Sequence, residues 1–572
     1  MVAGPMTASA VDTAGFDLLI IGSGAGGLAA AVAAVANGMH PLVCERTEFI
    51  GGTSALSGGE LWIPLNRQAG PAPDDSEAEA LEYLKHAVGT QLDEQRAAAY
   101  VHHARDALAF FEQHGNLAYE LLHSVVDYFE VPGAKLGLRS LGAIPFDGRR
   151  LGDQFSLLRA PLAVSQFFGG LSVGREDLPH FLGATRSLSS ALRVAGLLAR
   201  YASDRLRGYR RGTRLVMGNA LVARLASALF ERDVPIWLHA DVTALDVAGG
   251  KVVGAQVRRN GRTWSIRCSK GVVLAAGGFA GSREMQRAHY PHVRQGLAHR
   301  SHLPPSNDGT GLRLAIELGA SLDMRINQAG AWTPVSEVPR PNGSTDLFPH
   351  FGDRAKPGVL AVDGSGRRFA NEACCYHDFV TEMFRVIERT QSDAFWLISS
   401  HRWLRRQGLG RVPPAPAPVG PYLRNGYLIR GRSVADLARR IGVDVAALSR
   451  TVQTFDRYAT SGEDPDFGRG STIYQRAAGD PAQKPNPCVA PLGDGPYYAI
   501  KMLPGDIGNT LGLRVDDAAR VLGSAGEPIP GLYATGNSAA SLMGGTYPAA
   551  GIMLGQAITF GYLAVKTAKA AG

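Results

Sequence analysis

The sequence has little of what marks several large classes of protein. Only five of its 572 residues are cysteine, and none of them forms a C-x-x-C pair. This number and spacing argue against a disulfide framework and indicate no zinc site or redox dithiol. Charged residues make up 19% and hydrophobic residues 45%, which excludes extensive disorder. We therefore expect a globular protein of a reducing compartment, without a metal site.

The excess of positive charge is also small. Lys and Arg number 59 and Asp and Glu 51, a net charge of +8 that is too low to indicate nucleic-acid binding. Residues 1–17 contain no Lys or Arg, so we expect no secretory signal and a cytoplasmic location. Residues 18–36 are apolar, but the glycines between 22 and 27 predict a strand, a turn and a helix instead of a membrane span.

Glycine, in contrast, is abundant, with 70 residues. Residues 22–27, Gly-Ser-Gly-Ala-Gly-Gly, follow a short apolar run and precede an alanine-rich helical pattern at 28–37. Residues 40–44 predict a second strand, which completes a βαβ unit and indicates a parallel sheet. Glu45 follows that strand, where an acid can bond a ribose hydroxyl. The pattern predicts an α/β fold with a Rossmann-like domain that holds a pyrophosphate at the helix N-terminus.

Three more glycine-rich segments favour FAD over a nicotinamide cofactor. They lie at 51–59, 272–278 and 531–537, and each could contact one part of an extended ligand. The predicted cofactor-binding residues are Gly22, Ser23, Gly24, Ala25, Gly26, Gly27, Glu45, Arg46, Gly52, Thr53, Ser54, Ser57, Gly58, Gly59, Val242, Ala276, Gly277, Gly278, Gly536 and Asn537.

With these segments the chain resembles the flavoprotein superfamily that includes fumarate reductases and 3-ketosteroid dehydrogenases. Some members attach FAD to a histidine in the loop that corresponds to 51–59. This loop has no histidine, so the resemblance implies noncovalent FAD. Residues 531–572 contain no Arg or His, which argues against the cationic clamp that a dicarboxylate such as fumarate needs.

Three blocks carry a closer resemblance, to the 3-ketosteroid Δ1-dehydrogenases. Residues 544–551, Gly-Gly-Thr-Tyr-Pro-Ala-Ala-Gly, place a phenol and a glycine N–H four residues apart, which could hold one carbonyl oxygen. This block is similar to the C-terminal signature of the family. Residues 368–376 and 127–133 resemble the blocks with its catalytic and supporting tyrosines. The resemblance implies catalytic roles for Tyr128, Tyr376, Tyr547 and Gly551.

The reaction implied is 1,2-dehydrogenation of a 3-ketosteroid, from a 3-keto-4-ene to a 1,4-diene. Tyr547 and the Gly551 N–H would polarise the ketone, Tyr376 would take the C2 proton, and the C1 hydride would go to flavin N5. Tyr128 would lower the pKa of Tyr376 or pass its proton to solvent. A quinone-type acceptor would then take the electrons. His377 is left out, because in a strand it would point away from Tyr376.

Departures from the family pattern leave the substrate open. Members usually have Gly at 549, Pro at 556 and a further tyrosine near Val125, where this chain has Ala549 and Gln556. The alternatives are dehydrogenation at another steroid bond such as Δ4(5α), a different apolar ketone, or an ene-reductase. A noncatalytic lipid carrier on the same fold is a further alternative.

The resemblance also implies a domain organisation. The first part of an FAD-binding domain would span 1–333, an inserted α+β substrate domain 334–504, and the second part of the FAD-binding domain 505–572. A basic helical insertion is predicted at about 155–215, and a surface linker at 412–420.

Within the insertion, residues 186–214 carry eight arginines and one acid, Asp204. Leu188, Leu192, Ala195 and Ala199 recur there at helical spacing. This stripe could lie on anionic lipid as a peripheral membrane contact, or it could pack on its own domain.

Overall fold

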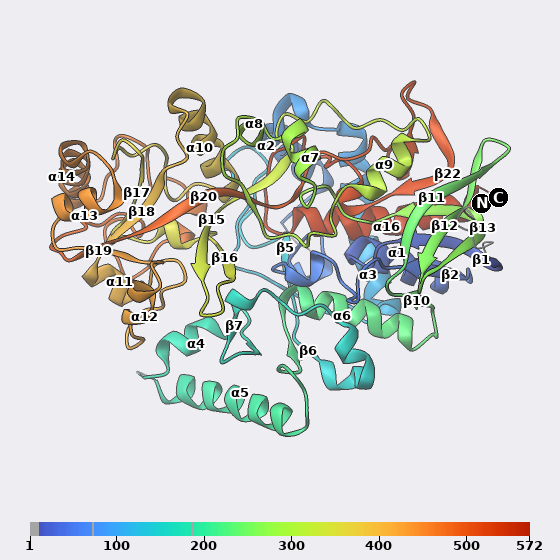
Figure 1. Ribbon diagram of the computed structural model, residues 1–572, viewed down its shortest axis with the longest axis horizontal. Helices are drawn as coiled ribbons and strands as arrows, with labels where there is room; N and C mark the ends of the chain where they lie inside the picture. Colours follow the sequence, from blue (N-terminus) through green and yellow to red (C-terminus); the bar gives the residue numbers. More distant parts are fainter. Residues whose placement is uncertain (1–10, 71–73, 186, 572) are drawn as a thin grey trace, which may run out of the picture.

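The computed structural model describes residues 11–70, 74–185 and 187–571, and it contains two large sheets. In Figure 1 the first sheet lies on the right and the second on the left. The first has eight strands in the order β10-β2-β1-β13-β12-β11, with β22 beside β13 and β21 beside β22. Its strands are β1 (Val11–Ile21), β2 (Pro41–Cys44), β10 (Ile236–Trp237), β11 (Asp241–Ala248), β12 (Lys251–Arg259), β13 (Arg262–Leu274), β21 (Arg520–Leu522) and β22 (Pro528–Ala534).

The predicted βαβ unit is confirmed. β1 pairs in parallel with both β2 and β13, and helix α1 (Ala25–Ala36) connects β1 to β2. Because side chains alternate along a strand, Leu18 and Ile20 pack in the same core as α1, whereas Leu19 and Ile21 pack on the opposite face. The sheet is mixed, since β12 pairs antiparallel with both β11 and β13.

Helices cover the α1 face of this sheet. Besides α1 they are α3 (Glu94–His114), α6 (Met217–Phe230) and α16 (Ile552–Ala570), with α2 (Glu77–Val88) against α3. α16 packs closely on α1: a Cβ on Gly561 would lie 2.7 Å from the Gly26 carbonyl oxygen. The end of the chain thus supports the helix that follows the first glycine loop. No helix within the described residues is both long and apolar enough to cross a membrane.

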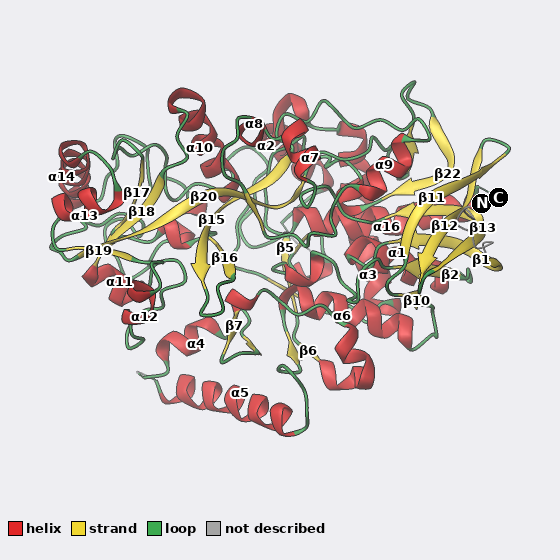
Figure 2. Cartoon of the chain, in the orientation of Figure 1, coloured by secondary structure: helices red, strands yellow, loops and turns green. Residues whose placement is uncertain are grey.

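The second sheet has seven strands in the order β16-β15-β20-β18-β17, with β14 and β19 also paired to β20. They are β14 (Arg300–Ser301), β15 (Gly330–Pro339), β16 (Thr345–Pro349), β17 (Val359–Asp363), β18 (Phe395–Ser400), β19 (Ile429–Gly431) and β20 (Tyr497–Asn509). Helices α10 (Tyr376–Thr390), α11 (His401–Gln407), α12 (Gly420–Arg424), α13 (Val434–Ile441), α14 (Val445–Ser461) and α15 (Ile473–Ala478) accompany it. Figure 2 shows this mixture of helix and strand. The exact domain boundaries stay a prediction.

Smaller elements connect these parts. They include β3 (Leu61–Trp62), β4 (Tyr119–Leu121), β5 (Ser140–Ala143), α7 (Arg283–His289), α8 (Pro291–Arg294) and α9 (Thr310–Ile316). A separate lobe lies at the bottom of Figure 1. In the sequence it begins after β6 (Phe146–Asp147) and ends before β9 (Arg214–Leu215), and these two strands pair antiparallel. It contains β7 (Gln166–Phe167), β8 (Leu171–Ser172), α4 (Leu178–Gly183) and α5 (Leu188–Leu206). We call residues 148–213 the insertion.

Candidate active site

A cavity of about 1080 Å³ begins at the carboxyl end of β1, where parallel sheets commonly bind ligands. Most of the predicted cofactor-binding residues line it: Gly22, Ser23, Gly24, Ala25, Gly26, Glu45, Arg46, Gly52, Thr53, Ser54, Ser57, Gly58, Gly59, Val242, Ala276, Gly277, Gly536 and Asn537. Gly27 and Gly278 are not among the lining residues. Both lie close to other groups of the protein, since a Cβ on Gly27 would lie 2.0 Å from the Gly22 carbonyl oxygen and one on Gly278 2.2 Å from Asn509 Oδ1.

Glu45 fixes the first glycine loop. Its Oε2 accepts hydrogen bonds from the Ser23 backbone N–H, at 3.1 Å, and from the Ser23 hydroxyl, at 2.6 Å. Its Oε1 accepts from the backbone N–H and hydroxyl of Thr47, both at 2.9 Å. The carboxylate is buried at the cavity wall, so it both holds the loop and faces the place where a ribose would lie.

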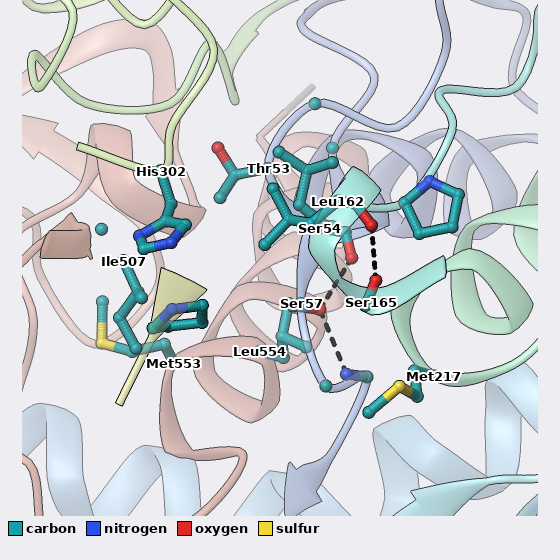
Figure 3. A pocket seen from close by; sticks show the side chains of 18 of the residues that line it. Thr53, Ser54, Ser57, Leu162, Ser165, Met217, His302, Ile507, Met553 and Leu554 are labelled. Carbon is teal, nitrogen blue, oxygen red and sulfur yellow. Dashed lines mark hydrogen bonds between the residues drawn. The ribbon is translucent and has the colours of Figure 1, made fainter. Parts of the chain in front are cut away.

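The second glycine loop joins the first from the other side. Ser54 Oγ accepts the Ala25 N–H at 2.9 Å, and the Thr53 hydroxyl accepts from Asn307 Nδ2 at 2.9 Å. Ser57 donates to the Ser54 carbonyl at 2.7 Å and accepts the Gly59 N–H at 3.1 Å, as Figure 3 shows. The result is a cradle of glycines and hydroxyls around a helix N-terminus, which fits a flavin dinucleotide.

The three predicted catalytic tyrosines come together from three distant segments and all line the cavity. The Tyr128 and Tyr376 hydroxyl oxygens lie 3.4 Å apart. The Tyr547 ring centre is 5.3 Å from that of Tyr376 and 6.2 Å from that of Tyr128. Gly551 lines the same cavity and precedes the first turn of α16, where backbone N–H groups have no partner within the helix.

Buried contacts hold Tyr128 against the Tyr547 segment. The Tyr128 N–H donates to the Pro548 carbonyl at 2.9 Å, and the Tyr83 hydroxyl donates to the same oxygen at 2.5 Å. The neighbouring Asp127 accepts from Trp62 Nε1 at 2.7 Å and forms an ion pair with Arg139 at 2.9 Å. These contacts fix the backbone that carries the Tyr128 ring.

The pKa values of the tyrosines correct one prediction. Burial raises the pKa of Tyr376 well above that of a free phenol, and Tyr128 raises it further. Burial likewise raises the pKa values of Tyr128 and Tyr547. The predicted lowering of the Tyr376 pKa by Tyr128 is therefore wrong, because an uncharged phenol in a buried site does not offset desolvation.

The local structure at Tyr376 corrects a second prediction. Tyr376 is the first residue of α10 and not part of a strand, so His377 does not point to an opposite sheet face. The His377 ring lies 6.4 Å from that of Tyr547, and its Nδ1 accepts the Trp332 N–H at 3.2 Å. Burial lowers the pKa of His377 to about 4, so the ring is neutral near pH 7. His377 thus packs beside the Tyr547 ring.

Two cavity features had no signal in the sequence motifs. His302 points into the cavity, as Figure 3 shows, and neither of its ring nitrogens has a hydrogen-bond partner among the described residues. The segment predicted as a surface linker is the second feature: residues 410–417 line the cavity, and Val412 is buried. The linker prediction is wrong for this part of the segment, because its prolines form a wall of the cavity.

Comparisons with known proteins agree with this geometry. The chain is 36% identical to the 4-oxocyclohex-2-ene-1-carboxylate 5-dehydrogenase of Sinomonas cyclohexanicum, covering 96% of this chain and 92% of the relative. It is 34% identical to a 3-oxosteroid 1-dehydrogenase of Mycobacterium tuberculosis, covering 96% and 97%. The solved 3-ketosteroid Δ1-dehydrogenase of Sterolibacterium denitrificans, in complex with 1,4-androstadiene-3,17-dione, superposes with a TM-score of 0.89 at 36% identity and covers 97% of this chain and 100% of that one.

The predicted α/β flavoprotein fold and the FAD cofactor are thus confirmed, as is the resemblance to the 3-ketosteroid dehydrogenases. The curated relatives differ in the ketone they are named for, so similarity alone establishes the reaction class and not the substrate. The family model for an FAD binding domain matches residues 17–554, and the chain therefore belongs to this family, as a flavin-dependent oxidoreductase that acts on CH–CH bonds.

Proposed function

We propose that the protein is a 3-ketosteroid Δ1-dehydrogenase that converts a 3-keto-4-ene steroid into the 1,4-diene. The meeting of Tyr128, Tyr376 and Tyr547 at one cavity, beside the flavin cradle, is the observation that carries the proposal. A C–H beside a ketone becomes acidic only when the developing enolate is stabilised, which requires donors at the carbonyl oxygen.

Each residue then has one role. The Tyr547 hydroxyl and the Gly551 N–H hold the ketone oxygen. Tyr376 removes the C2 proton, and Tyr128, 3.4 Å away, passes that proton onward. FAD, which the glycine cradle and Glu45 would hold, would supply the redox chemistry by accepting the hydride from C1. A quinone-type acceptor would then take the two electrons.

The cavity wall supports a large apolar substrate. Away from the flavin cradle its lining is mostly aliphatic or aromatic: Leu162, Val164, Phe167, Leu178, Phe181, Phe348 and Phe351, with prolines at 413, 414 and 416. Such a surface gains free energy by excluding water from a hydrocarbon skeleton. It offers few polar groups that a small, highly polar substrate would need.

One observation favours a second candidate, a cyclic ketone with a carboxylate, the kind of substrate for which the Sinomonas relative is named. Arg411 lines the cavity, and its guanidinium lies 5.8 Å from the centre of the Phe167 ring. No ion pair of the described residues includes Arg411, and a guanidinium without an acidic partner can bind a carboxylate.

The test is to mix the holoenzyme anaerobically with 4-androstene-3,17-dione and, separately, with 4-oxocyclohex-2-ene-1-carboxylate. We expect the steroid to bleach the flavin absorbance and yield a 1,4-diene, identified by mass and ring position. Tyr376→Phe and Tyr547→Phe should abolish bleaching, whereas Tyr562→Phe, a half-buried tyrosine on α16, should not.

Three other outcomes would contradict the steroid assignment. Bleaching by the carboxylate alone would support the second candidate. Because 4-androstene-3,17-dione already has the C4–C5 double bond, the other ring position is tested with the corresponding 5α-reduced 3-ketosteroid, and bleaching by that steroid but not by the 4-ene would indicate Δ4(5α)-dehydrogenation. Reoxidation of reduced flavin by an unsaturated ketone without net dehydrogenation would indicate an ene-reductase.

A further inference from the structure

The charged side chains of the cavity leave one cation without an acidic partner. Among the described residues they are Glu45, Arg46, Glu60, Arg175, Asp241, Asp308 and Arg411. Arg46 forms ion pairs with Asp241 and Asp308, and Arg175 forms one with Glu60. The Arg411 guanidinium has neither an acidic partner nor a side-chain hydrogen bond within the described part of the chain, and it lies near the ring of Phe167. The cavity therefore contains one positive charge that no acid of the protein balances.

Arg411 lies at the tip of a tight turn. The Leu409 and Val412 backbones exchange two hydrogen bonds, at 2.9 and 3.0 Å, and both side chains are buried. Gly410 has a φ of +54°, a conformation that favours glycine at the first central position of a two-residue turn. The Arg411 N–H donates to the Tyr427 hydroxyl at 3.0 Å. The turn thus fixes the backbone from which the guanidinium extends.

A buried hydrogen-bond network supports this turn from behind. The Tyr427 and Ser336 hydroxyl oxygens lie 2.8 Å apart, and Ser336 Oγ lies 2.9 Å from His350 Nε2. His350 Nδ1 lies 2.7 Å from Asp353 Oδ2. Tyr427, Ser336 and His350 are buried. Because these side chains are paired with one another, they hold the turn in one position, which reduces the entropy lost when a ligand binds there.

The same wall of the cavity leads from the turn to the tyrosine cluster. A Cβ on Gly410 would lie 3.1 Å from His350 Cε1. The next residue, Phe351, has its ring centre 5.0 Å from that of Tyr376, and Phe348 has its ring centre 5.2 Å from that of His350. Both phenylalanines line the cavity. The guanidinium and the tyrosines are thus separate points of one wall, with apolar rings between them.

This arrangement suits a ligand with a ketone at one end, a hydrocarbon skeleton in the middle and a carboxylate at the other end. A guanidinium can bind a carboxylate through two parallel hydrogen bonds, and the attraction is stronger in a largely apolar cavity than in water. We propose that the substrate is a 3-ketosteroid whose side chain ends in a carboxylate, and that Arg411 binds this carboxylate. The inference rests on the proposed steroid function and specifies its substrate class.

The apolar rings distinguish such a steroid acid from a small ring ketone. A cyclohexene carboxylate has few carbons, so with its ketone at the tyrosines it would leave much of the phenylalanine surface in contact with water. A steroid acid covers that surface and still presents an anion to Arg411. In this role Arg411 takes no part in proton or hydride transfer and determines specificity through binding alone.

The test compares three steroids with the holoenzyme: 3-oxochol-4-en-24-oic acid, its methyl ester, and 4-androstene-3,17-dione, which has no carboxylate. We expect kcat/KM for the acid to exceed that for the ester by about tenfold or more, with a smaller advantage at high salt. Arg411→Gln should raise KM for the acid by about tenfold with kcat unchanged, because the lost contact is the same in the ground and transition states. It should leave the kinetics of the ester and of the dione unchanged, and Arg411→Lys should keep part of the preference.

The matched control is Arg424→Gln, since Arg424 is exposed and is not among the residues that line the cavity. It should keep the wild-type preference for the acid. Equal kcat/KM for acid and ester in the wild type would overturn the inference and leave the proposed function intact. Equal losses for all three steroids in Arg411→Gln would indicate a structural role and also overturn it. If none of the three steroids reduces the flavin of the wild type, the proposed function fails, and the inference fails with it.

Discussion

The hydroxyl oxygens of Tyr128 and Tyr376 lie 3.4 Å apart in a buried site, yet the segments that carry them are separated by 248 residues of sequence. Their rings meet edge to face, with centres 6.0 Å apart. Because burial and Tyr128 both raise the pKa of Tyr376, the pair does not provide a phenolate at neutral pH by itself. The deprotonated fraction of Tyr376, which we propose as the base, increases as the pH rises.

The first prediction follows from that pKa. In the mechanism that we propose, only the deprotonated form of Tyr376 accepts the C2 proton, and its pKa is raised, so the active fraction increases with pH. We expect the rate of flavin reduction to rise continuously from pH 6 to pH 9 without reaching a plateau. Tyr128→Phe should lower that rate about 10- to 100-fold and change its pH dependence. A pH-independent rate in the wild type would show that Tyr376 is not the base.

A second prediction concerns Gly551. Its φ is +88°, and a Cβ there would lie 2.5 Å from the Glu60 carbonyl carbon and the Leu61 nitrogen. Gly551→Ala should displace the N–H that we assign to the ketone oxygen and reduce kcat by about 100-fold, the loss typical of one oxyanion donor. Gly343→Ala is the control, since Gly343 has a φ of +80° but no atom within 4 Å of its Cβ position. Steady-state kinetics on both variants test the assignment.

The third prediction concerns the flavin cradle. Gly27→Ala should prevent close packing of α1 on β1, since its Cβ would lie 2.0 Å from the Gly22 carbonyl oxygen. We expect purified Gly27→Ala to retain less than a tenth of the wild-type flavin, measured by visible absorbance against protein concentration. Gly38→Ala, at the end of the same helix with open space around it, should keep its flavin. Full flavin in Gly27→Ala would contradict this view of the loop.

A fourth prediction tests the buried ion pair under Tyr128. Arg139 contacts Asp127 at 2.9 Å and Asp75 at 2.6 Å, and all three side chains are almost fully buried. Arg139→Met leaves two buried carboxylates without their cation and should cost about 3–5 kcal/mol of unfolding free energy. Arg385→Met breaks the more exposed pair with Glu382 and should cost less than about 1 kcal/mol. Denaturant unfolding of both variants measures the difference.

The fifth prediction is a loss of stability in mild acid. Burial lowers the pKa values of His302 and His377 to about 4, whereas an unfolded histidine titrates near 6.5. Between these values the unfolded chain binds more protons, so stability falls as the pH decreases from 6.5 towards 4. Each histidine contributes up to about 3 kcal/mol to this loss. His377→Gln should flatten the dependence of the melting temperature on pH, and an unchanged slope would contradict the assignment.

The sequence by itself determined the cofactor domain. The strand, glycine loop and helix of residues 17–37 are encoded by neighbouring residues. The glycines allow the tight turn between strand and helix that a pyrophosphate site needs. The three tyrosine blocks could also be recognised from the sequence, because each is a short continuous segment. Their catalytic roles stay predictions.

Only the tertiary structure decided how these segments face one another. Residues 376 and 377 lie in a helix and not in a strand, and the prolines near 413 face a cavity and not solvent. Both outcomes depend on contacts with segments that are distant in the sequence. The same holds for α5. Its periodicity predicted an apolar stripe. In the structure that stripe faces outward, and ion pairs with Asp147, Asp177 and Arg149 hold the helix in this orientation. A helix can bury a face that carries charged groups only where the rest of the fold supplies partners for them.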